Sequence, residues 1–347
     1  MKSKGGTTKT MRQGNVKNYR MKSPILIICI ILFGALIFFS FLKQPAYAGE
    51  GGSSSYTPGT YGDFSMNYAE PGLYLRENII YYKGKLDDFP LFPTVNANLE
   101  QTTWFNLLTV TYIAQQKLLG GHYFFTTSIP YGFSVKLDTD VPAMGFSQHD
   151  SVSKMGELGV GDIWVAPVGL MWHVGSFHIT LTENIVLPTG DYSSNDVINM
   201  GRNYTSYETD IGLTWLDEEN GHEVSFVAGY MINERNEETD YKTGDEFHID
   251  FALNQYFSER FGVGITGYYC QQITDDSSPD LDTINAVNSA FGLPTPDGYK
   301  GSSAGVGPAI MWGLSKDIQV IAKWIYEYHA ENRFKGDWAF VSLNVKF

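Results

Sequence analysis

The strongest constraint on the fold is a strict alternation of apolar and polar residues from Phe177 to Leu187. Five of the six odd positions in this run are apolar, and four of the five even positions are polar. A period of two places these sets on opposite faces of a β-strand. A second extended run, from Gly159 to His173, is separated from the first by only three residues. The two runs therefore predict a tight hairpin.

The same alternation recurs along the chain and predicts twelve strands. In residues 246–254, for example, Phe247, Ile249 and Phe251 alternate with polar, charged or small residues. Alternation of this kind is typical of strands that separate an apolar from a polar environment. The predicted strands are residues 73–83, 102–114, 121–131, 159–173, 177–187, 204–216, 222–233, 246–254, 261–274, 304–312, 318–329 and 339–347.

The lengths of the connections indicate how these strands are arranged. Short connections, such as residues 217–221 and 258–260, alternate with mostly longer ones, such as 132–158 and 275–303. Short periplasmic turns alternating with long extracellular loops favour an all-β, twelve-stranded antiparallel transmembrane β-barrel over residues 71–347. The alternative is a soluble β-sandwich, which also alternates faces but whose loops need not segregate in this way.

Residues 1–48 have the pattern of a cleaved signal peptide. A basic segment without acidic residues precedes an apolar stretch from Pro24 to Leu42, and Ala46 and Ala48 provide the small residues of a cleavage site. Met21 would also begin a leader of ordinary length. The alternative is an uncleaved anchor, because the apolar stretch is long enough to span a bilayer.

Charge and composition after the leader narrow the class of protein further. Removing residues 1–48 leaves 16 basic against 38 acidic residues, a net charge of −22, which argues against a nucleic-acid partner. Cys270 is then the sole cysteine, so no disulfide within the chain is possible. Residues 49–70 are rich in Gly, Ser and Tyr without periodicity, which favours a loosely held, flexible segment.

Charged residues on the predicted inward faces are the candidate lining of a solute path. They are Arg76, Glu208, Asp210, Glu246, His248, Asp250, Lys323 and Glu327. In a wet lumen such residues could bind a cation or polarise a ligand, or could form a solvated network that satisfies its own hydrogen bonds. A zinc site needs three or four convergent ligands and residues 246–254 supply one His, so neither a metal nor a cofactor is expected.

Several short motifs resemble one family of outer-membrane proteins, named after the meta-pathway of phenol degradation. The motifs are Gly-x-Gly-Asp from Gly159, Pro-Thr-Gly-Asp-Tyr at 188–192, Gly229-Tyr230 and Gly267-Tyr268-Tyr269. The resemblance implies an outer-membrane barrel that acts as a channel or transporter for small, often aromatic compounds. The terminal Phe347, at the end of an alternating strand, resembles the signal that the barrel-assembly machinery reads.

These observations predict the location and the activity of the protein. We expect a Gram-negative outer-membrane channel or transporter for passive movement of small solutes, apolar and aromatic ones among them. Its partners would be the lipid bilayer, the barrel-assembly machinery and a small-molecule solute. No defensible nucleophile–base pair and no phosphate-binding Gly loop were found, so an enzyme is not expected. The alternative is a structural or surface-exposed adhesion barrel with a plugged lumen, which would not transport.

Overall fold

The structure is a computed structural model that describes residues 49–50, 54–92, 95–143, 146–154, 159–196, 198–290 and 300–347. The predicted signal peptide, residues 1–48, lies outside the described residues. No helix in the described part of the chain combines the length and the hydropathy needed to cross a bilayer.

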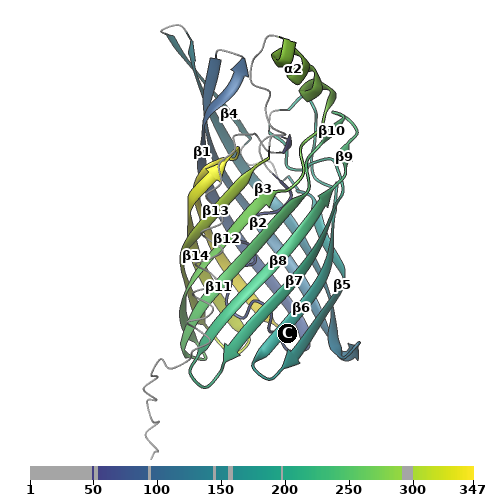
Figure 1. Ribbon diagram of the computed structural model, residues 1–347. Helices are drawn as coiled ribbons and strands as arrows, with labels where there is room; N and C mark the ends of the chain where they lie inside the picture. The colour runs from purple at the N-terminus through teal and green to yellow at the C-terminus, as the bar shows by residue number, and fades with distance from the viewer. Residues whose placement is uncertain are drawn as a thin grey trace, which may run out of the picture. The chain divides into compact units, whose positions relative to one another are not determined.

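Twelve antiparallel strands form a closed β-barrel (Figure 1), as the sequence predicts. Each strand pairs with its neighbours in chain order, and β1 also pairs with β15, which closes the barrel. Closure removes every sheet edge from the wall, as spanning a bilayer requires. The strands are β1 Gly72–Phe92, β2 Val95–Leu118, β3 Gly121–Ala143, β5 Ile163–Val174, β6 Phe177–Leu187, β7 Ser206–Asp217, β8 His222–Asn233, β11 Glu246–Ser258, β12 Phe261–Gln272, β13 Ser302–Gly313, β14 Ile318–Glu331 and β15 Lys335–Lys346.

The two ends of the barrel differ as the alternation of connection lengths predicts. Short turns lie at one end, together with the C-terminus (Figure 1). Three of these turns use glycines with positive φ, Gly120 at 81°, Gly175 at 60° and Gly221 at 71°, a conformation that side-chain-bearing residues rarely adopt. The longer connections lie at the other end and contain the short strands β9 Arg235–Asn236 and β10 Tyr241–Lys242 and the helix α2 Pro279–Ala290.

Two predicted connections prove to be largely strand. Residues 84–101 were expected to join two strands, but β1 continues to Phe92 and β2 begins at Val95. Residues 132–158 were expected to be a connection, but β3 continues through Gly132 to Ala143 and pairs with the additional strand β4, Phe146–Lys154. Gly132 has a φ of 66° and interrupts the pairing register without ending the strand. A glycine within a strand pattern marks a bulge more readily than an end.

The outer surface of the barrel is apolar, and most of the polar side chains point inward. In β7, Tyr207, Ile211 and Leu213 are exposed on the outside, whereas Glu208 and Asp210 are buried on the inside. An apolar belt facing outward and a polar lumen are what a bilayer-spanning barrel requires.

Candidate functional site: the barrel lumen

The N-terminal segment, residues 54–70, lies inside the barrel against its inner wall. Tyr56, Asp63, Phe64 and Asn67 are each at most 4% exposed. Their partners come from strands around the barrel, and Asn67, for instance, exchanges hydrogen bonds with Thr180 of β6 and Thr214 of β7. This differs from the loosely held segment that the composition favoured. The tyrosines and small polar residues that suggested flexibility are the groups that bond to the lumen wall.

Two tyrosines fix the segment to acidic residues of the wall. The hydroxyl of Tyr56 donates to Asp250 Oδ2 at 2.6 Å, and the hydroxyl of Tyr61 donates to Glu208 Oε2 at 3.3 Å. Burial is the main cause that raises the pKa of both tyrosine hydroxyls, so they stay protonated and act as donors.

Two cations of the wall hold the middle of the segment. Lys323 Nζ donates to the carbonyl oxygens of Gly59 and Gly62, both at 2.7 Å. Arg76 forms an ion pair with Asp63, which is 3% exposed. A buried ammonium needs such partners, because an unpaired charge away from water is costly. Arg76 and Lys323 therefore bind the segment itself.

The other sequence-predicted site residues also point inward and are buried. Glu246 accepts a hydrogen bond from Arg333 at 2.6 Å. Glu327 accepts bonds from Tyr82 at 3.1 Å and from the indole of Trp338 at 2.9 Å. All eight side chains lie on the inner face of the barrel wall, and each forms hydrogen bonds to other groups of the protein.

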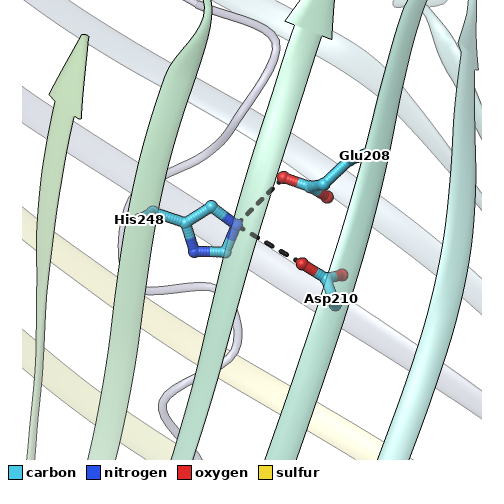
Figure 2. A group of neighbouring side chains, drawn as sticks. All are labelled: Glu208, Asp210 and His248. Carbon is cyan, nitrogen blue, oxygen red and sulfur yellow. Dashed lines mark hydrogen bonds and ion pairs between the residues drawn. The ribbon is translucent and has the colours of Figure 1, made fainter. Parts of the chain in front are cut away.

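Figure 2 shows a cluster of three neighbouring side chains on the barrel wall, Glu208, Asp210 and His248. Nε2 of His248 lies 2.9 Å from Glu208 Oε1 and 3.6 Å from Asp210 Oδ1. On the other side of the ring, Nδ1 lies 3.1 Å from Asp250 Oδ2. The three side chains in the figure come from β7 and β11, with β8 between them. They are the only described residues that converge as a potential metal-binding group.

An internal cavity of about 1570 Å³ adjoins the segment. On β2, β3 and β5 its lining includes an apolar set that we call the apolar wall: Phe105, Leu107, Ile113, Phe124, Ala166 and Met171. Thr109, Thr111 and Thr126 lie among them and also face the cavity. The lumen therefore has a charged side, which binds the segment, and a largely apolar side.

Sequence reasoning missed the apolar wall, although a signal was present. The strands predicted at 73–83 and 102–114 have mixed alternation, with apolar neighbours such as Phe105 beside Trp104 and Leu107 beside Leu108. In a membrane barrel, one face of each strand contacts lipid and the other faces the lumen. A strand with apolar residues on both faces therefore gives the lumen an apolar side. In β2 the structure exposes Trp104 on the outside and buries Phe105 on the inside.

Gly49, which precedes the segment in the chain, is bound by the buried acid Asp276 among the long connections. The backbone nitrogen of Gly49 donates to Asp276 Oδ2 at 2.7 Å, and Tyr241 donates to the same oxygen at 2.6 Å. Gly244 N and the side chain of Gln272 donate to Oδ1. Burial raises the pKa of the Asp276 carboxyl. The segment thus extends from this end of the barrel towards the start of β1 at the short-turn end.

Fold and lumen together define a transmembrane β-barrel of the outer-membrane type. Residues 92–343 match the model of the family described as "Putative MetA-pathway of phenol degradation", and the chain belongs to this family. This confirms the resemblance drawn from the short motifs. None of the curated proteins matches this chain.

Solved structures share the fold at low sequence identity. The COG4313 outer membrane channel from Pseudomonas putida F1 matches with a TM-score of 0.59 and 11% identity, over 84% of this chain and 100% of that chain. The β domain of the Bordetella autotransporter BrkA matches with a TM-score of 0.43 and 9% identity, over 80% of this chain and 100% of that chain. The first of these likenesses supports the barrel fold.

Proposed function

We propose that the protein is an outer-membrane channel for passive movement of small apolar solutes, including aromatic ones. The observation that carries the proposal is the cavity of about 1570 Å³ beside the apolar wall. Ligand sites for apolar compounds are concave and mostly apolar, with a few polar groups that orient the ligand. The threonines within the wall and the tyrosines of the segment would supply those polar groups.

The comparisons with known proteins also support a channel. The family description refers to phenol degradation, and the Pseudomonas barrel is named as an outer membrane channel. Passage through a lipid-embedded barrel requires no catalytic residues, and we propose transport without catalysis. The eight charged residues predicted from the sequence would contribute to the path mainly by holding the segment beside it.

The leader-like N-terminus and the last strand also suggest how the protein reaches the membrane. We propose export with a signal peptide cleaved after Ala48 and insertion into a Gram-negative outer membrane. Phe347 is 72% exposed at the end of β15, where its backbone nitrogen bonds to Leu73 at the barrel seam. We propose that the side chain of Phe347 is bound by the barrel-assembly machinery during insertion.

A second candidate function is a non-transporting structural or adhesion barrel. The observation that favours it is the N-terminal segment, which is bonded to the wall along its length inside the lumen. A twelve-stranded barrel has limited room once a segment and long side chains occupy it.

Planar-bilayer recordings separate the two functions. A channel gives discrete conductance steps, and a bulky aromatic solute such as 2-naphthol interrupts the current when it enters the cavity. Ala166→Trp fills the cavity from the apolar wall and should weaken this block. Ala228→Trp, on the outer face of β8, is the matched control and should not. A silent bilayer for the folded protein would favour the structural barrel.

A further inference from the structure

Three potential ligand atoms converge on one point of the lumen wall. Glu208 and Asp210 of β7 and His248 of β11 each offer one ligand atom, and these atoms all lie within 4.8 Å of one another. All three side chains are at most 5% exposed. One imidazole nitrogen with two carboxylate oxygens is a donor set that divalent transition metals accept.

Gly229 of β8 leaves the space into which these atoms point. It pairs with Asp210 on one side and with His248 on the other, so it lies directly between them. A Cβ atom at this position would overlap both His248 Nε2 and Asp210 Oδ1. The absent side chain therefore provides a small volume at the point where the three atoms meet.

A buried oxygen of Asp210 without a hydrogen-bond partner in the described part of the chain is a second, independent indication of a ligand at this point. Oδ1 of Asp210 is buried and accepts no hydrogen bond of ordinary length from the described residues, and the 3.6 Å to His248 Nε2 is too long for one. An unsatisfied buried carboxylate oxygen is costly, so such an atom calls for a partner. With Asp250, three carboxylates surround a single imidazole, and a cation would offset their charge.

The opposite side of the His248 ring is arranged as it is around metal-binding histidines. Asp250 Oδ2 lies 3.1 Å from Nδ1 and also accepts a hydrogen bond from Tyr56. A carboxylate that accepts the Nδ1 proton leaves the Nε2 lone pair free for a metal and fixes the orientation of the ring.

We propose that Glu208, Asp210 and His248 bind one divalent transition-metal ion, such as Zn²⁺, beside Gly229. Tetrahedral coordination with bonds of about 2.0–2.1 Å places ligand atoms about 3.3 Å apart. The observed separations of 2.9 and 3.6 Å from His248 Nε2 bracket that value. The sequence raised cation binding for the inward charged residues but did not indicate that these three converge, because they come from two strands that are brought together across a third.

The test is metal binding by the full-length folded barrel in detergent. After treatment with a chelator, we expect calorimetric titration with ZnCl₂ to show one tight site per barrel. Gly229→Ala retains every ligand but fills the space, and should abolish that site, as should His248→Gln. Asp250→Asn should weaken binding by about 10–100-fold, the range for a carboxylate that orients a metal-bound histidine.

Two control variants and a second measurement complete the test. Glu223→Gln and His329→Gln change a buried acid and a histidine of the wall elsewhere, and should leave the tight site intact. If Gly229→Ala does not fold, the visible absorption of Co²⁺-loaded protein, compared with that of His248→Gln, reports whether an imidazole is a ligand. No tight site in the wild type, or equal binding in His248→Gln, would overturn the proposal and leave a hydrogen-bonded ionic network.

Discussion

The hydroxyl of Tyr56 donates a hydrogen bond to Asp250 at 2.6 Å, although the two residues are 194 positions apart in the chain. The Tyr56 ring also stacks on His248, with centroids 4.0 Å apart. Tyr56 of the N-terminal segment thus contacts two side chains on the charged side of the lumen, Asp250 and His248. Barrel and segment share one polar network, and changes in either should alter the other.

Tyr56→Phe should loosen the segment. The substitution retains the ring but removes one of the two hydrogen bonds that Asp250 Oδ2 makes, which should lower the free energy of unfolding by about 1.5–3 kcal/mol, the range for hydrogen bonds to charged groups. Denaturant unfolding of the barrel in lipid vesicles measures this change. Tyr326→Phe, an exposed tyrosine on the outer face of β14, is the control and should be close to neutral.

Fixing the segment to the wall should leave the conductance unchanged if solutes pass beside it. A Cβ at Gly62 would touch Thr266 Oγ1, so Gly62→Cys with Thr266→Cys brings two thiols within reach of a disulfide. With Cys270 replaced by Ser, we expect the same current under oxidising conditions and after reduction, because the proposed path runs through the cavity beside the segment. A loss of current that reduction restores would mean that the segment must move.

Lipid exposure should make the cost of a charge depend on depth. Ile211 is 58% exposed near the middle of β7, and Ile211→Arg should cost about 2–4 kcal/mol, the range for a lipid-facing arginine at the bilayer midplane. Val174 is 65% exposed at the turn end, and Val174→Arg should cost about 0–1 kcal/mol. Equal, small effects in vesicle-based unfolding would mean that both positions face water.

Cleavage after Ala48 should create an ion pair at the long-loop end. The new α-ammonium of Gly49 would lie where its backbone nitrogen now bonds to Asp276 at 2.7 Å. Intact-mass measurement should give a chain that begins at Gly49, and Asp276→Asn should destabilise it by about 1.5–3 kcal/mol, the range for hydrogen bonds to charged groups. A mature protein that retains residues 24–42 would contradict this prediction.

Cations should pass more readily than anions if the lumen conducts. Among the described inward residues, the acids outnumber the bases, and a narrow low-dielectric passage concentrates the field of such charges. The acids are Glu208, Asp210, Glu223, Glu246, Asp250 and Glu327, and the bases are Arg76, Lys323 and Arg333. Reversal potentials in a salt gradient measure the preference, and a clear anion preference would contradict it.

Some features were predictable from local pattern and others were not. The faces of β6, β7 and β11 follow from alternation alone, and Glu208 and His248 were correctly placed inside. Asp250 was expected to face a wet lumen, yet it is fully buried beneath Tyr56. No local pattern in residues 49–70 indicates that this segment packs inside the barrel, because most of its partners, such as Asp250 for Tyr56 and Lys323 for Gly59, lie more than a hundred positions further along the chain.

The sequence by itself determined the twelve strands, their antiparallel order and, where the alternation is clear, the side of the wall on which a residue lies. These properties depend on a period of two and on the length of connections, both of which are local. Only the tertiary structure decided what fills the lumen and which side chains meet there. The pairing of β8 with β7 and with β11 places Asp210, Gly229 and His248 on three adjacent strands at one level. That level depends on the pairing register, to which every strand of the barrel contributes.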